Sequence, residues 1–494
     1  MLELLRRVGR DVNKIDRDLV RASARIPRGP LDPGLKALTT AANHSVLWLT
    51  IAAVLASRKG GTRRAAFRGV LAIAGASFTA NVVVKPVAPR RRPAAEDVPT
   101  RRTLSDPPES SSFPSGHAAS AAAFTTAVAL ESPLAGAVLA PVAVAVGYSR
   151  VHTGVHWPSD VAAGMLLGSG IALATRRWWP VRPDLPSVTR PGAPVAPGLP
   201  EGNGLLVLVN PGSGADGVDP GSEVVEALPA ARVLHPDAGS DLTEELERAV
   251  DGVTRAIGVA GGDGTVSAAA TVAAGLGLPL AVIPAGTLNH FARDVGLDGV
   301  AHTAEAVQEG CGVSVDLGAV CVDEGVARPF VNTASLGAYP DTVRWRERHE
   351  GRWGKWPTAA AAVLMSFRNC TPLTVRIDGR SRSVWMVFVG NGPYHPGGLA
   401  PAWRPRLDTG LLDVRYLRAD LPFSRVRFVL SAITGTLERS RAYVRWECPE
   451  LEVEVRGETP EPVATDGEIG ASGRHFRFRS QRGALLVYRP SSPG

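Results

Sequence analysis

Three side chains with complementary chemistry lie within one short stretch, residues 149–160. They are Arg150, His156 and Asp160. A guanidinium group forms a planar fork that suits the oxygens of a phosphoryl group. A carboxylate beside one imidazole nitrogen fixes the tautomer and leaves the other nitrogen free as a nucleophile. His156 and Asp160 are four residues apart, so they share one face if a helix begins there. An ordinary polar helix cap explains this stretch, taken alone, about equally well.

Two earlier stretches add groups for the same chemistry. Lys85 and Arg92 follow an apolar run and add positive charge for a phosphate. Ser115 and the amide of Gly116 can donate hydrogen bonds at a helix N-terminus, which is a natural anion site. His117 can protonate a leaving alkoxide. Basic residues flanking a membrane segment, and a simple turn, would explain these stretches if each stood alone.

Together, the three stretches match the motifs Lys-x6-Arg-Pro, Pro-Ser-Gly-His and Ser-Arg-x5-His-x3-Asp. Residues 40–177 thereby resemble the phosphatidic-acid-phosphatase type 2 / vanadium haloperoxidase superfamily. The resemblance implies a phosphohistidine at His156, a general acid at His117 and an orienting role for Asp160. It also implies that no metal or other cofactor is required in this half. The implied phosphate-binding residues are Lys85, Arg92, Ser115, Gly116 and Arg150.

Length and charge bound the class of protein. A chain of 494 residues is too long for one ordinary domain, so about two to four are expected. Lys and Arg number 54 against 47 Asp and Glu, which gives a net charge of +7. The basic excess lies before about residue 190 and suits an anionic membrane surface better than nucleic acid. We therefore expect membrane lipids as partners and no nucleic acid.

The cysteines and the N-terminus indicate the compartment. All four cysteines lie in the second half, and their spacing fits neither a zinc site nor a disulfide framework. Four free thiols in a reducing compartment is the favoured interpretation, which places that half in the cytosol. The first residues lack the long apolar core and the cleavage site of a signal peptide. The cysteines are Cys311, Cys321, Cys370 and Cys448.

Five apolar runs predict a helical membrane bundle of about five spans within residues 1–179. Several runs are short for a span of about 20 residues. A soluble helical bundle, as in the haloperoxidase branch, is the alternative. Residues 1–35 are amphipathic and could lie on the membrane surface, on the bundle or in solvent. The apolar runs are 42–57, 66–86, 117–131, 134–148 and 161–175.

A proline-rich linker, residues 180–203, separates this half from a second one. Buried strands are predicted at 205–209, 256–260 and 280–283, with helical stretches between them. This alternation predicts a doubly wound α/β nucleotide-binding lobe over 204–315. Strand-like runs dominate afterwards and predict a β-rich, sandwich-like lobe over 316–494. Those runs are 373–377, 383–389, 412–416, 451–456 and 475–480.

Each of the first three strands is followed by a polar, glycine-rich turn. Ligands of open α/β sheets bind beyond the carboxyl ends of the strands, where glycines let amides approach phosphates. The Walker lysine is missing, so the pattern is not a P-loop. Any one turn could be plain loop chemistry, but three at successive strand ends favour a phosphate site. The turn residues are Asn210, Gly212, Ser213, Gly214, Gly261, Gly262, Asp263, Gly264, Thr265, Gly286 and Thr287.

Residues 203–490 resemble the diacylglycerol kinase / sphingosine kinase catalytic superfamily through Gly-Gly-Asp-Gly-Thr at 261–265 and Asp-Gly-Glu at 466–468. The resemblance implies that ATP phosphates lie over the glycine-rich turns. It makes Asp466 the candidate base for a lipid hydroxyl, with Asp263 as the rival base or a Mg2+ partner through water. Asp408 is the expected metal-associated carboxylate, and Glu468 joins the nucleotide site. Phosphoryl transfer of this kind calls for Mg2+.

Two departures from the pattern of the kinase family leave the identity of the lipid acceptor open. His290 stands where bacterial diacylglycerol kinases usually have an aspartate, and Thr409 replaces the second aspartate of an Asp-Asp-Gly turn. The acceptor is thus diacylglycerol-like, a long-chain base or a polyprenol. Other motif positions that fit are Asn332, Gly337, Gly390, Asn391, Gly410 and Asp413.

The leading hypothesis is a bifunctional, multi-pass membrane enzyme, a lipid phosphate phosphatase fused to an ATP-dependent lipid kinase. In one alternative, one half is catalytically altered and serves as a lipid-binding or regulatory module. In another, the first half is a soluble vanadate-dependent oxidase. ATP and free thiols place the kinase half inside the cell and the phosphatase site outside. The positive-inside rule partly disagrees, because residues 1–35 are basic.

Overall fold

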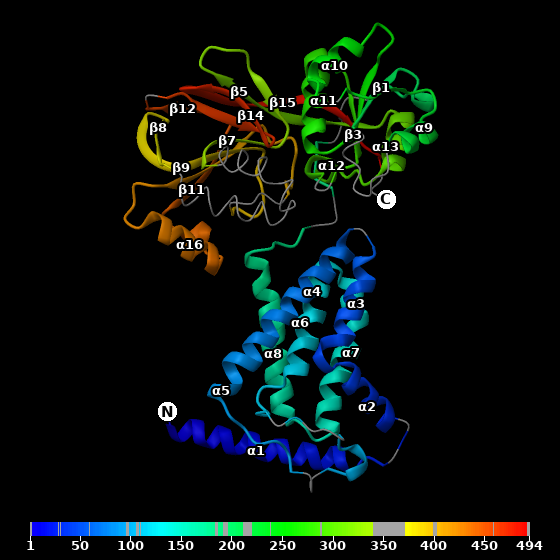
Figure 1. The fold of residues 1–494 in the computed structure, drawn as a ribbon, viewed down its shortest axis with the longest axis vertical. Helices are drawn as coiled ribbons and strands as arrows, with labels where there is room; N and C mark the ends of the chain where they lie inside the picture. The colour runs from blue at the N-terminus through cyan, green and yellow to red at the C-terminus, as the bar shows by residue number, and fades with distance from the viewer. Residues whose placement is uncertain are drawn as a thin grey trace. The chain divides into compact units, whose positions relative to one another are not determined.

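The computed structural model divides the chain into two compact units, Met1–Arg182 and Pro183–Gly494 (Figure 1). The division falls within the proline-rich stretch 180–203. The residues described are 2–27, 29, 31–58, 60–94, 98–104, 108, 110–182, 186–190, 196–210, 220–237, 239–286, 289–338, 371–398, 403–457 and 459–491.

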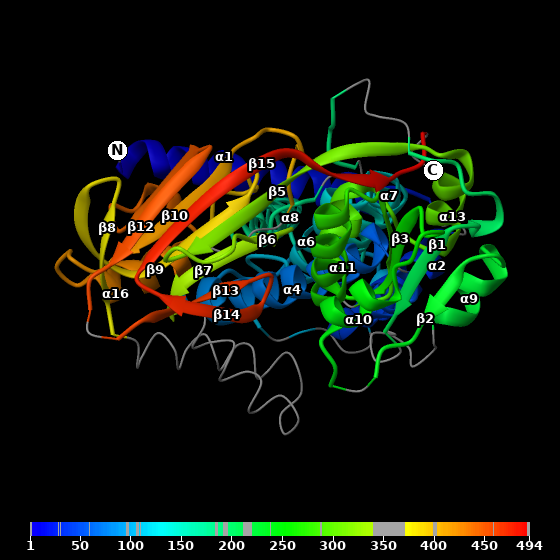
Figure 2. The same cartoon turned by 90° about the horizontal axis from the view of Figure 1, so that it is seen from above.

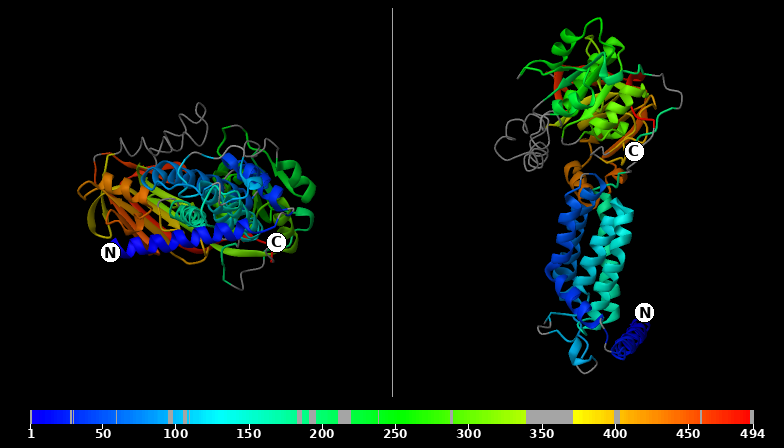
Figure 3. Two further views of the ribbon diagram at one scale, coloured as in Figure 1. Left: turned by 90° about the horizontal axis from the view of Figure 1, so that it is seen from below. Right: turned by 90° about the vertical axis from the view of Figure 1, so that its right-hand side faces the viewer.

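The first unit is built from helices (Figures 1 and 3). Helix α6 packs against α4, α7 and α8, and α1 contacts α7 and α8. Small residues, mostly alanine, fill the buried positions of α6, so its neighbours can approach closely. The helices are α1 (Leu2–Ala24), α2 (Leu31–Ala41), α3 (Val46–Ala56), α4 (Gly61–Phe78), α5 (Lys85–Val87), α6 (Gly116–Glu131), α7 (Pro133–His152) and α8 (Pro158–Ala174).

The helices agree with the five apolar runs, but only some are long enough to span a bilayer. Gly61–Val87, in which a π-helical stretch joins α4 to α5, and Pro133–His152 qualify by length and composition. A third span exists if the bent pair Asp32–Ala41 and Asn43–Ala56 crosses as one. Helices α6 and α8 have 16 and 17 residues. Since a span needs about 20 residues, the count of five spans stays a prediction.

Two glycines set the distance between α8 and α6. They are Gly164 and Gly168, spaced as in the small-xxx-small motif of closely packed membrane helices. A Cβ at Gly164 would overlap the carbonyl oxygen of Ser115, and one at Gly168 would overlap that of Ala119. This close approach brings the start of α8 beside the start of α6, where the amide of Ser115 donates to the carbonyl of Asp160 over 3.0 Å.

The other end of α6 carries a buried charge. Glu131 accepts a 2.8 Å hydrogen bond from Arg68 Nε and a 3.0 Å one from Arg64 Nε, so α4 and α6 are tied together. Arg68 also lies 4.9 Å from the centre of the Trp179 ring and donates to its carbonyl. Arg68 is fully buried. The segment after α8 is therefore fastened to the bundle through one guanidinium group.

The second unit is a mixed α/β structure around one branched, 15-stranded sheet (Figure 2). Off the main path, β10 (Leu412–Arg418) pairs with β9 and β11 (Tyr443–Cys448), while β5 (Gly312–Val322) pairs with β15 and β6 (Arg328–Phe330). The main path runs β14 (Glu468–Gly473), β13 (Glu461–Thr465), β7 (Thr333–Gly337), β9 (Arg380–Asn391), β8 (Leu373–Ile377), β12 (Glu450–Val455), β15 (His475–Tyr488), β4 (Leu280–Pro284), β3 (Ala256–Gly261), β1 (Leu205–Val209) and β2 (Arg232–Leu234).

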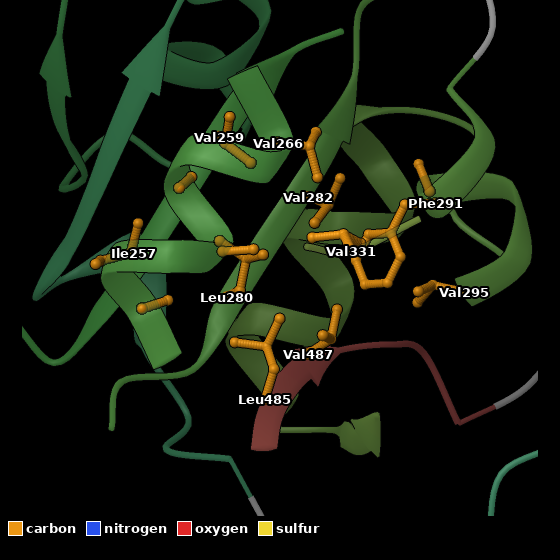
Figure 4. Close-up of a cluster of buried hydrophobic side chains, with 14 of the residues drawn as sticks. Ile257, Val259, Val266, Leu280, Val282, Phe291, Val295, Val331, Leu485 and Val487 are labelled. Carbon is orange, nitrogen blue, oxygen red and sulfur yellow. The ribbon is translucent and has the colours of Figure 1, made fainter. Parts of the chain in front are cut away.

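Strands β2, β1, β3 and β4 form a parallel sheet with helices on both faces. Because both faces are covered, every residue of β1 is buried. Alternate residues of these strands face two cores. One core, drawn in Figure 4, packs against α10 (Leu242–Ala249), α11 (Asp263–Leu276) and α12 (His290–Val295). The other packs against α9 (Pro220–Ala227) and α13 (Val300–Glu309).

The remaining strands are antiparallel and enclose a third core. One helix in this part is α16 (Ser424–Thr434). Strand β15 pairs with β12 and β5 and also, in parallel, with β4 at Val487 and Leu280. This long strand makes the sheet continuous. The predicted boundary at residues 315 and 316 falls inside β5.

We predict that Gly168→Ala destabilises the first unit, whereas Gly170→Ala does not. The new methyl group at 168 meets a carbonyl oxygen of α6, while nothing lies within 4 Å of a Cβ at 170. The expected loss for Gly168→Ala is roughly 1–3 kcal/mol. Gly170→Ala should be neutral or stabilising by up to about 1 kcal/mol. Thermal unfolding in detergent micelles, followed by circular dichroism, provides the measurement. Equal midpoints for the two variants would contradict the close packing of α8 on α6.

Candidate functional site

His156 lies in the loop between α7 and α8 and is 2% exposed. Its Nδ1 lies 2.6 Å from the carbonyl oxygen of Ser112. A carbonyl oxygen can only accept, so Nδ1 carries the proton in this arrangement and Nε2 keeps its lone pair. The imidazole therefore has an unprotonated Nε2, which is the nitrogen that a nucleophilic role would require.

Asp160 is a neighbour of His156 but not its direct hydrogen-bond acceptor, contrary to the simplest expectation. Its Oδ2 lies 3.7 Å from His156 Nδ1, which is beyond hydrogen-bond distance. Other donors bind both of its oxygens. Arg90 Nη1 donates to Oδ1 over 2.6 Å, and the amide of Trp157 donates to Oδ2 over 2.9 Å. Asp160 thus caps α8 and holds Arg90 as well as acting on His156 through its charge.

The surroundings keep His156 neutral. Burial lowers the pKa of His156 to about 4, and the positive charges of Arg150 and Arg92 act in the same direction. Asp160 opposes this shift. At neutral pH the imidazole is therefore uncharged, which a nucleophile requires.

The predicted phosphate-binding residues converge from four elements. Arg150, near the end of α7, is 1% exposed and donates to Thr39 Oγ1 over 2.6 Å. Its Nε is buried without a hydrogen-bond partner among the described residues. A buried guanidinium with a spare donor fits an anionic ligand. Lys85 and Arg92 both reach Ser110, whose Oγ accepts from Lys85 over 3.4 Å.

The start of α6 supplies the remaining donors. Ser115 is the N-cap residue, and its Oγ accepts from the amide of Ala118. Gly116 is the first residue of the 16-residue helix, so its amide is among those without an intrahelical partner. His117 follows, and its Nε2 lies 2.9 Å from Oδ1 of Asn43. All residues of the three motifs are therefore brought to one end of the bundle.

Sequence reasoning missed three residues of this site: Thr39, Asn43 and Arg90. Thr39 and Asn43 precede the motifs and belong to the bent region before α3. The one local signal for Asn43 is a polar break, Asn43–Ser45, between two apolar stretches. Arg90 lies inside the first motif but at a position that the motif leaves open.

In the second unit, the glycine-rich turns that follow β3 and β4 touch each other, and Asn210, at the end of β1, reaches the turn after β3. Asn210 donates from Nδ2 to Thr265 Oγ1 over 3.2 Å. A Cβ on Gly286 would lie 2.6 Å from the Cα of Gly262, and one on Gly261 would lie 2.7 Å from the Cβ of Thr265. Side chains are therefore excluded where these turns touch. Gly212, Ser213, Gly214 and Thr287 lie outside the described residues.

Asp263 is the first residue of α11 and has an unsatisfied oxygen. Backbone amides of His290 and Phe291 donate to its carboxylate, yet burial raises its pKa overall. Oδ1 is buried and has no hydrogen-bond partner among the described residues. A buried carboxylate oxygen without a donor, at a helix start beside glycine-rich turns, fits a cation bound together with phosphates.

Asp466 differs from Asp263 because its carboxylate is fully hydrogen-bonded. It occupies the two-residue turn between β13 and β14, with a positive φ of 50°. Ser267 Oγ donates to it over 2.6 Å, and amides of Val331, Asn332 and Thr333 donate over 2.7–2.9 Å. Burial raises the pKa of Asp466 even though these donors favour the charged form.

Helix α11 brings the two carboxylates to one face. Asp263 and Ser267 are four residues apart on α11, so the Ser267–Asp466 hydrogen bond places Asp466 on the face that carries Asp263. Glu468 also reaches this helix start, since a Cβ on Gly264 would lie 3.3 Å from its Oε1.

Asp408, the predicted metal-associated carboxylate, is paired with an arginine in the structure. Its carboxylate pairs with Arg406 at 2.9 Å and accepts the amide of Arg190 over 2.6 Å. The guanidinium of Arg406, two residues away, thus supplies the positive charge beside Asp408. No group of three or more His, Cys, Asp or Glu side chains arranged for a metal ion occurs among the described residues. The association of Asp408 with a metal therefore stays a prediction.

Arg404 contacts several residues of the kinase motifs, and no pattern in the sequence indicates it. Its guanidinium is buried, donates to Asp294 Oδ2 over 2.8 Å and to the carbonyls of Val331 and Asn391, and reaches Asn332 Oδ1. The conformation of Asn332, whose amide binds Asp466, therefore depends on a side chain 72 residues away in sequence.

His290 and Thr409, which depart from the pattern of the kinase family, each take part in a hydrogen bond. His290 is the first residue of α12 and its amide binds Asp263. Thr409 accepts the amide of Leu411 through Oγ1 over 3.3 Å.

Comparison with known proteins assigns both units. The family model of the PAP2 superfamily matches residues 65–184, and the model of the diacylglycerol kinase catalytic domain matches residues 204–320. A crystal structure of a diacylglycerol kinase from Bacillus anthracis str. Sterne covers 58% of this chain and 97% of that chain, with 20% identity and a TM-score of 0.40.

Two curated proteins of Mycobacterium tuberculosis (strain ATCC 25618 / H37Rv) are similar to the two halves. A diacylglycerol kinase is 30% identical over 244 residues, which cover 46% of this chain and 77% of that protein. A decaprenylphosphoryl-5-phosphoribose phosphatase is 35% identical over 154 residues, which cover 30% of this chain and 81% of that protein. The chain therefore belongs to two enzyme families at once, the PAP2 superfamily of phosphatases through its first unit and the diacylglycerol kinase family through its second.

Proposed function

We propose that this chain is a bifunctional membrane lipid enzyme. Its first unit hydrolyses lipid phosphates, such as phosphatidate or polyprenyl phosphates and diphosphates, through a phosphohistidine. Its second unit transfers a phosphoryl group from ATP to a diacylglycerol-like alcohol. The observation that carries the first activity is a neutral, buried His156 next to Arg150, whose Nε is buried and unpaired among the described residues. The Oδ1 of Asp263, buried beside glycine-rich turns and without a partner among the described residues, carries the second.

In the phosphatase reaction, His156 Nε2 attacks phosphorus. A P–N bond forms while the P–O bond to the lipid breaks, and His117 gives its proton to the leaving alkoxide. Water then cleaves the P–N bond, which releases inorganic phosphate and restores both histidines. Arg150, Arg92 and Lys85 neutralise the charge on the phosphoryl oxygens during both steps.

In the kinase reaction, the proton of the lipid hydroxyl passes to Asp466 through the hydroxyl of Ser267, which takes up that proton as it gives its own to Asp466 Oδ2. The raised pKa of Asp466 suits a general base. The amides at the start of α11, including that of Gly264, face the phosphate site. Asp263 is the residue that fits Mg2+, through its Oδ1. ATP would supply the phosphoryl group, whose new P–O bond to the lipid oxygen forms as its bond to the leaving ADP breaks, and bound Mg2+ would offset the negative charge.

The phosphatase assignment predicts that His156→Ala lowers phosphate release by at least about 10³-fold. The substrates for this test are phosphatidate, decaprenyl phosphate and undecaprenyl diphosphate in mixed micelles. A rapid acid-free quench with a radiolabelled substrate should trap phosphohistidine in the wild type and not in the variant. Kinase activity of His156→Ala should equal that of the wild type. Full phosphate release by the variant would refute the assigned nucleophile.

The kinase assignment predicts distinct effects for two conservative variants. Asp466→Asn removes the base and should lower kcat by about 10²- to 10⁴-fold. Asp263→Asn removes the cation partner and should raise the Mg2+ concentration for half-maximal activity. The assay measures phosphate transfer from labelled ATP to dioleoylglycerol, sphingosine or undecaprenol.

Phosphatase activity of the same preparations serves as the control for folding. If Asp466→Asn kept its activity while Asp263→Asn lost all of it at saturating Mg2+, the two roles would be reversed. If the wild type transferred no phosphate to any acceptor, the second unit would be a binding module, and the departures at His290 and Thr409 would mark the loss.

We further infer that the kinase unit is cytosolic and that the phosphatase site faces the other side of the membrane. ATP and free thiols support the first part. In a background in which the four native cysteines are replaced by serine, Arg25→Cys should react with an impermeant maleimide in intact cells. Val326→Cys, whose parent side chain is 95% exposed, should react only after lysis. The reverse pattern would overturn this orientation.

A further inference from the structure

We propose that helix α1 is part of the phosphatase site, with Asp16 as a positioning residue that acts on His156 through Arg90. This inference rests on the proposed phosphatase function and adds a contribution from outside the motifs. Residues 1–64 precede the part of the chain that matches the PAP2 model. Neither Asp16 nor Arg90 belongs to the fixed positions of the three motifs.

Asp16 is the buried anchor of α1. It is 2% exposed, whereas its neighbours Ile15 and Arg17 are exposed. Three donors point at its carboxylate. The amide of Ser159 donates to Oδ1 over 2.9 Å, while Ser159 Oγ and Arg90 Nη2 donate to Oδ2 over 2.6 and 2.7 Å. All three donors lie in the segments around the phosphatase site, so the charge of Asp16 is compensated entirely there.

Arg90 connects Asp16 to the two groups that face His156 Nδ1. Its side chain donates from Nη1 to Asp160 over 2.6 Å. Its backbone carbonyl accepts the amide of Ser112 over 3.0 Å, and the carbonyl of Ser112 in turn accepts from His156. One residue therefore holds both the acceptor that sets the histidine tautomer and the carboxylate that acts on it through charge.

The guanidinium of Arg90 is fixed on every side. Nη1 binds Asp160 and Ser159 Oγ, and Nη2 binds Asp16 and Asn13 Oδ1. The ring of Trp157 lies 5.7 Å from its central carbon. Without α1, both bonds from Nη2 would be lost and the group could rotate away from Asp160. A charge-assisted pair on each side of the fork prevents this rotation.

Helix α1 is also fastened beyond Asp16. Arg102, which is 1% exposed, donates to the carbonyls of Ser23 and Ile26 over 2.7 and 2.8 Å. Ser23 Oγ lies 3.2 Å from the hydroxyl of Tyr148 on α7. These contacts keep α1 attached when the hydrogen bonds of Asp16 are weakened. A substitution at position 16 should thus change the geometry of the site before it detaches the helix.

The test compares Asp16→Asn with Asp18→Asn, which removes an exposed carboxylate from the same helix. The substrate is whichever lipid phosphate of the panel above the wild type cleaves fastest. Asp16→Asn should lower kcat by roughly 10- to 100-fold with KM changed less than about twofold, because misplacement of a reacting group affects the chemical step. Asp18→Asn should match the wild type. Ser159→Ala, which removes the hydroxyl between Asp16 and Arg90, should lower kcat in the same way and guards against misfolding of Asp16→Asn.

A double-mutant cycle separates positioning from general stability. Arg90→Lys should lower kcat, and adding Asp16→Asn to it should have little further effect, since both act through one guanidinium. Multiplicative effects, or a raised KM with unchanged kcat, would overturn the proposal. Wild-type kcat in both Asp16→Asn and Ser159→Ala would also overturn it. If His156→Ala kept full activity, the proposed function itself would fail, whatever the result at position 16.

Discussion

The buried charge of Asp160 is the feature on which the first unit depends. This carboxylate has no exposed surface, so every oxygen must find a donor within the protein. Arg90 and the amide of Trp157 supply those donors, and the amide of Ser115 binds the carbonyl of the same residue. The starts of α6 and α8 and the loop that holds His156 are thereby fixed together. The glycine contacts between α8 and α6 are what let this charge lie so close to the start of α6.

Asp466 has the corresponding role in the second unit. It collects donors from α11, through Ser267, and from the segment before β7, through the amides of residues 331–333. A carboxylate in a tight hairpin turn thus joins the parallel part of the sheet to the antiparallel part. Long strand β15 makes the same connection through the backbone. Continuity of the sheet and the position of the proposed base therefore depend on each other.

Much of this organisation could be predicted from the sequence, because it depends on local pattern. The apolar runs overlap the observed helices, and the strands 205–209 and 373–377 match the observed bounds. Asp16, Asn43 and Arg404 could not be predicted, because their contacts join residues about 70 to 140 positions apart without any local repeat. The hydrogen bonds of Asp160 and Asp408 with nearby arginines could not be predicted either, because no motif indicates which cation a carboxylate will meet.

The two proposed reactions run in opposite directions on the same chemical group, and this limits how one chain can carry both. If both sites acted on one lipid in one leaflet, the net result would be ATP hydrolysis without any product. The reactions are therefore useful together only if their lipids differ or if the bilayer separates their substrates. Separate buried networks around Asp160 and Asp466, each closed within its own unit, allow either solution, because neither site needs a residue of the other unit to set its geometry.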